Sequence, residues 1–299
     1  MNGAAGAAPT YTFLSGVSDA AVEDGTPVSN INPINLEYQL CFKCHSGFTK
    51  LLPSIAGKPS LDALDKGIEF NPNNPSFHPV EAKGKNETAA MTASLAGTSP
   101  SKLWDFTVGS TIRCLNCHAS GSTDTTTDPT LTAPGAALAP HSSSNRGILL
   151  KNYRDRVLKS TIDPYSSGDF ALCYGCHAEE PFVAGGSAST KTNFSEHSRH
   201  LNLLSSKGNG LTSIDTPGDG QGNAICAECH FRIHSTTSEV GVVGNTRLVS
   251  FAPNVQPNGG TLSWTAATTT APGSCTLTCH GHDDTDAGQQ YPALPAPLP

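Results

Sequence analysis

Ten cysteines occur as five pairs along the 299-residue chain, and a histidine directly follows each pair. The motifs are Cys41, Cys44 and His45; Cys114, Cys117 and His118; Cys173, Cys176 and His177; Cys226, Cys229 and His230; and Cys275, Cys279 and His280. Two residues separate the cysteines of the first four pairs, so each of these motifs is CxxCH. CxxCH is the attachment signal of a c-type haem, in which both thiols form thioethers and the histidine binds the iron. The sequence therefore predicts covalent haem at these motifs.

The fifth motif, CTLTCH, has three residues between its cysteines. The longer loop still allows two thioethers and an iron-binding histidine, and we expect a fifth haem c here. The alternative is a local disulfide between Cys275 and Cys279, with His280 in solvent.

A zinc site is the competing interpretation of the whole set. Tetrahedral sites pair a CxxC with a distant second CxxC or a pair of histidines. Here a histidine adjoins every pair, and the first cysteines of successive motifs are 73, 59, 53 and 49 residues apart. This pattern favours haem over zinc.

Six histidines lie outside the motifs: His78, His141, His197, His200, His234 and His282. Methionine, the other common second ligand of haem iron, occurs only as Met1 and Met91. We therefore expect bis-histidine iron throughout, with five second ligands: His78, His141, His197, His200 and His234. His282, two residues beyond His280, is predicted to be spare.

His234 lies four residues after His230, one turn apart if that segment is helical. Two histidines on one helix face cannot occupy opposite sides of one iron, so we expect His234 to bind a neighbouring haem. His197 and His200 have similar spacing, and each is expected to serve a different iron.

The composition predicts a chain organised around cofactors. Charged residues are 14% of the chain, aromatic residues 6%, and Gly and Pro number 29 and 22. Such a composition alone is typical of a loop-rich polymer. With five haems, we expect a coil-rich multihaem fold with very little β-structure, a few short helices at and between the motifs, and a core of stacked haems.

Local patterns predict only a few elements. Helices are expected at 36–45, at 147–159 and after Asn193, where Glu196 completes a capping box before His197. A hairpin is expected over 238–251. The connectors at 121–140 and 216–224 are expected to be coil, and the Pro-rich end, 291–299, to be extended.

We predict an N-terminal extension at 1–35, a pentahaem region at 36–282 and a Pro-rich tail at 283–299. We expect no signal peptide in the first residues given, because no Lys or Arg precedes their apolar residues. Covalent haem attachment nevertheless implies export in bacteria. We expect a mature form, a fragment of a longer polypeptide, or a chain whose Met1 was added.

Charge and hydropathy exclude some partners. The formal charge is −7, and no basic cluster is present, which argues against nucleic acid. No run of eighteen apolar residues occurs, so we expect a soluble chain without a membrane span.

The chain resembles the secreted multihaem c-type cytochromes of metal-respiring bacteria, which include extracellular forms that polymerise into conductive filaments. The resemblance rests on CFKCHSG, CLNCHAS, CYGCHAE, CAECHFR and CTLTCHGH, with FHPV at 77–80 and HSRHL at 197–201, and covers roughly 36–282. It implies closely packed haems and a periplasmic, extracellular or cell-surface location. The implied partners are other cytochromes, copies of the chain itself, and acceptors such as metal oxides.

An iron with two histidine ligands has no vacant position for a substrate, so we expect an electron carrier and not an enzyme. Two alternatives remain. One is a multihaem reductase of the nitrite or hydroxylamine type with one open iron. The other is a filament subunit whose haems are structural.

Overall fold

The computed structural model describes residues 36–42, 45, 66–120, 140–154, 165–183, 192, 194, 197–201, 224–236, 245–257, 262–268, 270–279, 282–283 and 289–291. The chain divides into two compact units. Unit 1 takes in the chain up to Lys85 together with Thr111–Cys114 and Ile233–Leu248. Unit 2 is formed by Asn86–Ser110, Leu115–Arg232 and Val249–Pro299. The predicted pentahaem region thus contributes to both units, whereas nearly all of 1–35 and 283–299 lies outside the described residues.

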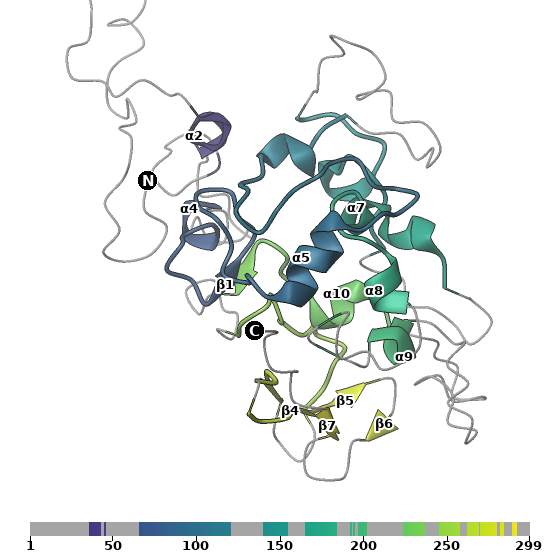
Figure 1. Ribbon diagram of the computed structural model, residues 1–299. Coiled ribbons are helices and arrows are strands. Elements are labelled where there is room, and N and C mark those ends of the chain that lie inside the picture. The colour runs from purple at the N-terminus through teal and green to yellow at the C-terminus, as the bar shows by residue number, and fades with distance from the viewer. Residues whose placement is uncertain are drawn as a thin grey trace, which may run out of the picture. The chain divides into compact units, whose positions relative to one another are not determined.

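The described residues of unit 1 form the short helices α2 and α4 and a pair of strands, of which Figure 1 labels β1. The helices are α2 (Glu37–Phe42) and α4 (Lys66–Glu69). Strand β1 (Ser76–Phe77) pairs antiparallel with β2 (Ser235–Thr236), which is far away in sequence. The hydroxyls of Ser76 and Thr236 are buried and hydrogen-bonded to each other at 2.7 Å. This pairing brings the segment before Val80 to the segment after Cys229.

A largely aromatic cluster lies buried among the described residues of unit 1. Tyr38, Phe42, Phe70 and Val80 are buried against each other, and Cys114 packs on them. Phe42 is 1% exposed, so helix α2 is held by the side chain that lies between the two cysteines of the first motif. The core of this unit therefore adjoins the motif thiols.

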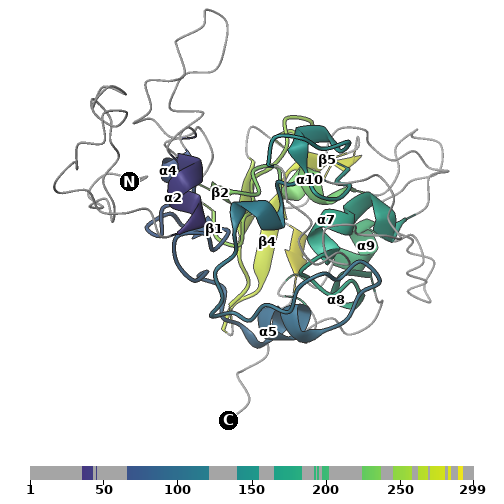
Figure 2. The ribbon, with the colours of Figure 1, turned by 90° about the horizontal axis from the view of Figure 1, so that it is seen from above.

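Unit 2 holds most of the described helices. They are α5 (Ala89–Ala96), η2 (Arg146–Ile148), η3 (Ser167–Phe170), α7 (Ala171–Tyr174), α8 (Glu180–Val183), α9 (His197–Leu201) and α10 (Cys226–Cys229). Figures 1 and 2 both show α7, α8, α9 and α10 gathered in one part of this unit. Phe170, Tyr174, Ile225 and Ala227 form the buried cluster between them.

The C-terminal part of unit 2 is built from short strands. Strands β3 (Ser263–Thr265), β4 (Gly273–Thr276) and β7 (Gln289–Tyr291) form an antiparallel sheet with β4 in the centre. Strands β5 (Thr278–Cys279) and β6 (His282–Asp283) form a separate antiparallel pair.

Two predicted helices are confirmed where the structure describes them. Helix α2 lies within 36–45, and α9 carries His197 and His200 as expected. The capping residues proposed for the second helix, Asn193 and Glu196, lie outside the described residues.

The helix predicted at 147–159 is wrong for its described part, 147–154. Only the 3-10 turn η2 is present there, and Gly147 has a left-handed φ of 71° that interrupts it. The backbone bonds to distant partners instead: Leu150 N–H donates to the Cys117 carbonyl at 2.7 Å, and Arg154 N–H donates to the Asp169 carbonyl at 2.7 Å. The segment is therefore held by contacts to residues distant in sequence and not by a helix of its own.

The hairpin predicted at 238–251 is also wrong for its described half, 245–251. These residues form a turn and an isolated bridge from Ser250 to His230. Ser250 N–H donates to the Cys229 carbonyl at 2.8 Å, and its own carbonyl accepts from Phe231 N–H at 2.9 Å. Ser250 thus pairs with the fourth motif rather than with a hairpin partner. The other predicted coil segments and the Pro-rich end lie mostly outside the described residues.

In the part of the chain that the structure describes, no helix combines the length and apolar character needed to cross a bilayer.

Asn74 should be a stability determinant of unit 1. Its buried side-chain amide donates to the carbonyls of Ile68 (2.7 Å) and Glu69 (2.8 Å), which end helix α4. Asn74→Ala leaves both carbonyls without this donor and should lower the free energy of unfolding by about 1–3 kcal/mol. The neighbouring exposed Asn73 provides the control, because Asn73→Ala should change it by less than about 0.5 kcal/mol. Denaturant unfolding of both variants measures the difference, and equal effects would contradict this role.

Candidate haem-binding sites

Three of the motifs share one local backbone geometry. The histidine N–H donates to the carbonyl of the first cysteine, at 2.9 Å for His45 and Cys41, 3.0 Å for His177 and Cys173, and 2.8 Å for His230 and Cys226. This is the bond of a helical turn, and it forms at α2, α7 and α10. Positions i, i+3 and i+4 of such a turn lie on one face. At the third and fourth motifs the turn therefore presents two thiols and an imidazole to the same side, as one porphyrin attached by both thiols requires.

The second motif uses a tighter turn. The 3-10 helix η1 (Cys114–Asn116) begins at its first cysteine. His118 Nδ1 donates to the Gly147 carbonyl at 3.2 Å. Gly147 is the residue with the left-handed φ, so a glycine is favoured at the acceptor.

The fifth motif differs from the others because its backbone is extended. Cys275 lies in β4 opposite Trp264, and Cys279 lies in β5 opposite His282. No helical turn joins its two cysteines. The structure does not describe Cys44, His280, or the side chains of Cys279 and His282.

Cysteines of consecutive motifs lie close to one another within each unit. In unit 1 the thiols of Cys41 and Cys114 are hydrogen-bonded. In unit 2 the thiols of Cys173 and Cys226 are hydrogen-bonded. Cys275 lies close enough to Cys229 to raise the pKa of the Cys229 thiol. Neighbours in sequence order are thus neighbours in space.

Three of the motif thiols, those of Cys117, Cys176 and Cys229, are not activated nucleophiles. Burial is the main cause that raises the pKa of Cys117, Cys176 and Cys229 to about 12, and nearby acidic groups add to it. A thiol with such a pKa stays protonated at neutral pH, which disfavours direct cysteine catalysis.

Several imidazoles are fixed in one tautomer. His78 Nδ1 donates to the Ile233 carbonyl, as His118 does to Gly147, because a carbonyl can only accept. His234 Nδ1 donates to Glu69 Oε2 at 2.5 Å. In a neutral imidazole whose Nδ1 carries the proton, Nε2 holds the lone pair. These rings therefore have the tautomer in which Nε2 binds a metal.

His197 reaches the same tautomer through a hydroxyl. Thr192 Oγ1 donates its one proton to the Phe194 carbonyl at 2.5 Å. In its 2.9 Å contact with His197 Nδ1, the Thr192 oxygen is therefore the acceptor and the ring N–H is the donor. The motif histidine His177 is hydrogen-bonded through Nδ1 as well, to Ser94 Oγ at 3.1 Å.

The surroundings of His197 are aromatic. Its ring lies 5.2 Å from the Phe182 ring and 5.0 Å from the Phe194 ring, centroid to centroid. Loss of hydration, followed by the neighbouring charges of His230 and His200, lowers the pKa of His197 to about 3. His197 is therefore neutral at physiological pH, and it lies near the motif histidine His230.

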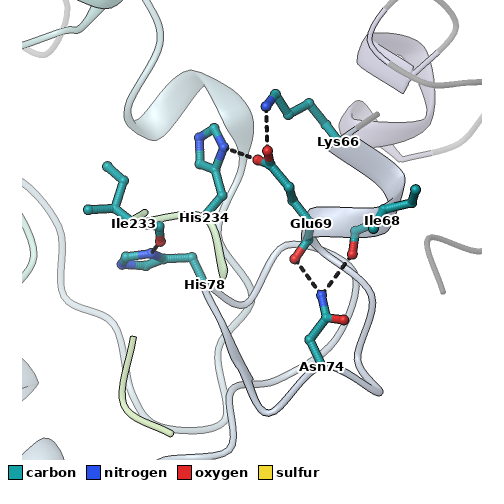
Figure 3. A network of polar contacts seen from close by, with 7 residues as sticks. All are labelled: Lys66, Ile68, Glu69, Asn74, His78, Ile233 and His234. Atoms are coloured by element: carbon teal, nitrogen blue, oxygen red, sulfur yellow. Dashed lines mark hydrogen bonds and ion pairs between the residues drawn. The ribbon is translucent and has the colours of Figure 1, made fainter. Parts of the chain in front are cut away.

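His78 and His234 are held together in unit 1. His78 N–H donates to the His234 carbonyl at 2.9 Å, next to the β1–β2 pair. Figure 3 shows the two side chains leaving the backbone in different directions, with the Ile233 carbonyl next to the His78 ring. Two histidines so arranged suit two different irons.

The remaining sequence-predicted ligands have less defined surroundings. His200 lies on α9, where its ring is 5.4 Å from the Phe194 ring and its carbonyl accepts from Ala224 N–H at 2.9 Å. His141 lies in an exposed turn.

Sequence reasoning missed the residues that orient the imidazoles. Glu69 and Ser94 bind histidines 165 and 83 residues away, and no local pattern points to either of them. Thr192 lies five residues before His197, so this partner, unlike the other two, is close enough in sequence to be considered from the sequence alone.

Within the described residues, no three or more His, Cys, Asp or Glu side chains gather as a metal-binding group. A haem iron takes four ligands from the porphyrin and needs only two from the protein. The helical turns of the motifs and the fixed tautomers of the additional histidines fit such a group. Comparisons with protein-family models, curated proteins and solved structures found no match.

Gly97 should control the position of His177. A Cβ at Gly97 would lie 2.6 Å from the Ala178 Cβ, beside His177, and α5 carries Ser94, which binds the ring. Gly97→Ala should therefore cost about 1–3 kcal/mol of stability through steric overlap.

Gly109→Ala is the matched control, because its nearest contact would be an ordinary 3.8 Å to Thr107 Oγ1. Thermal unfolding of the two variants should separate them. If Gly97→Ala is as stable as the control, the close packing of α5 against Ala178 is not present in solution.

Proposed function

We propose that this protein is a multihaem c-type cytochrome that carries electrons between partners outside the cytoplasm. The observation that carries the proposal is the fixed tautomer of histidines outside the motifs. His78, His197 and His234 are each hydrogen-bonded at Nδ1 to an acceptor, so each offers Nε2 as a ligand atom. A solvated surface histidine needs no such partner, whereas metal-binding histidines almost always have one.

The motif residues would hold the cofactors. The thiols of each pair would form the thioethers, and His45, His118, His177, His230 and His280 would bind iron from one side. Histidines from elsewhere in the chain would bind from the other side: His78, His141, His197, His200 and His234. His282 would remain spare. Bound haem supplies an iron that alternates between the ferric and ferrous states.

For one site the structure favours a particular pairing. His230 directly follows α10 and His197 begins α9, both in unit 2, and His230 is close enough to His197 to contribute, after burial, to the lowered pKa of His197. We propose His197 as the second ligand of the iron bound by His230. Phe182 and Phe194, which pack on His197, would exclude water from this ligand.

The order of the motifs supports a conducting role. The thiol contacts Cys41–Cys114 and Cys173–Cys226 join consecutive motifs. Cofactors attached in chain order would then have their nearest neighbours in that order, which is the arrangement that stepwise electron transfer needs. Two histidines at each iron would leave no position for a substrate, so catalysis at iron is not part of the proposal. Other cytochromes, copies of the chain and extracellular acceptors such as metal oxides are the proposed partners.

The holoprotein should carry five covalent haems, one per cysteine pair. Intact mass under denaturing conditions should exceed the polypeptide mass by five haem units. A Cys275→Ser, Cys279→Ser double variant should carry four, because only the fifth attachment site is removed.

Four haems on the unmodified chain, with no loss in the double variant, would show that the extended fifth motif does not bind haem. A mass lower by two hydrogens would then identify a Cys275–Cys279 disulfide.

The reduced protein should pass electrons to soluble ferric chelates and should not turn over nitrite or hydroxylamine. Stopped-flow oxidation measures the first reaction, and consumption of the nitrogen compounds under continuous reduction measures the second. Sustained nitrite or hydroxylamine turnover would show that one iron has an open position. The protein would then be a reductase and not an electron carrier.

A further inference from the structure

We infer that Glu69 is a positioning residue that lowers the reduction potential of the haem bound by His234. The inference rests on the proposed function, because it takes His234 as an iron ligand.

The contact between Glu69 and His234 is short, and both oxygens of the Glu69 carboxylate are hydrogen-bonded. Glu69 Oε2 accepts from His234 Nδ1 at 2.5 Å, and Glu69 Oε1 accepts from Lys66 Nζ at 2.7 Å (Figure 3). Residue Glu69 is 4% exposed, and the Phe70 ring lies 4.8 Å from the His234 ring. The carboxylate is therefore shielded from water on the side where it meets the imidazole.

The backbone around Glu69 fixes this geometry. The Glu69 carbonyl accepts from the Asn74 amide, and α4 begins at Lys66, whose N–H donates to the His45 carbonyl at 2.9 Å. The carboxylate is thus tied to the segment of the first motif and to the turn before β1. His234 is placed by β2, so the contact forms only when the two distant segments pair.

At His234 the acceptor of the Nδ1 proton is a carboxylate, that of Glu69. His78 and His118 donate to backbone carbonyls, and His197 donates to a hydroxyl. His177 is hydrogen-bonded to the Ser94 hydroxyl. A carboxylate draws the Nδ1 proton more strongly than these neutral groups do, and so makes Nε2 a stronger electron donor.

A stronger donor stabilises ferric over ferrous iron, which lowers the reduction potential. Lys66 opposes part of this effect, because its ammonium stabilises the negative charge on Glu69. The two neighbours of the carboxylate should therefore shift the potential in opposite directions when they are removed.

The test is a spectroelectrochemical titration of the five-haem protein. Glu69→Gln keeps the size and an acceptor oxygen but removes the charge. One component should shift toward higher potential, with a roughly tenfold change in its ferric-to-ferrous equilibrium, or about 59 mV for a one-electron couple. All haems should remain low-spin. Lys66→Met should move the same component the other way.

Asp105→Asn is the control. It also removes one carboxylate charge, but the Asp105 side chain is 96% exposed and pairs with Lys102 at 3.3 Å. A shift of equal size in this variant would overturn the inference, because the effect would then be that of general charge. If Glu69→Gln does not fold, Lys66→Met carries the test alone, and the absence of a shift toward lower potential in that variant would overturn the inference.

His234→Ala tests the ligand role of His234 separately from the role of Glu69. If one haem becomes high-spin in this variant while Glu69→Gln shifts no component, His234 is a ligand and the role of Glu69 is wrong. If His234→Ala leaves every haem low-spin at its original potential, the ligand assignment fails and the role of Glu69 fails with it.

Discussion

The hydrogen bond from the motif histidine to the carbonyl of the first cysteine is the interaction on which the proposed sites depend. It closes one helical turn at Cys41, Cys173 and Cys226, and at the third and fourth motifs this turn directs two thiols and one imidazole to the same side. The turns are short: α7 and α10 have four residues each. Isolated helices of this length are unstable in water, so these turns need tertiary support. Phe42 in α2 and Tyr174 in α7 supply it, since each is a buried motif residue packed into the core of its unit.

The second constraint is the approach of the additional histidines to the motifs. These residues come from other segments, and His78, His197 and His234 are each oriented by a partner at Nδ1. In unit 1 the β1–β2 pair joins His78 to His234, although more than 150 residues separate them. In unit 2, α9 brings His197 near His230. Many of the described contacts around the motifs thus orient imidazole rings. Such contacts need few charged or aromatic residues, and the chain contains few of them.

The sequence predicted the features that depend on local spacing. The cysteine pairs with their histidines, helix α2 and the helix bearing His197 and His200 all follow from residues within one or two turns. It did not predict features set by long-range contacts. The segment 147–154 has helical periodicity, but its backbone bonds to Cys117 and Asp169. Ser250 bridges to the fourth motif for the same reason. Glu69 meets His234 through segments 165 residues apart, and one sequence contains no signal for such a contact.

The central claim is that two histidines hold every iron. Electron paramagnetic resonance of the fully oxidised five-haem protein tests it most directly, because a ferric iron with two imidazole ligands is low-spin and one with an open position is high-spin. The account predicts low-spin signals that integrate to the full haem content measured on the same sample. A high-spin signal that amounts to one haem per chain would contradict it, since it would show an iron without its second histidine.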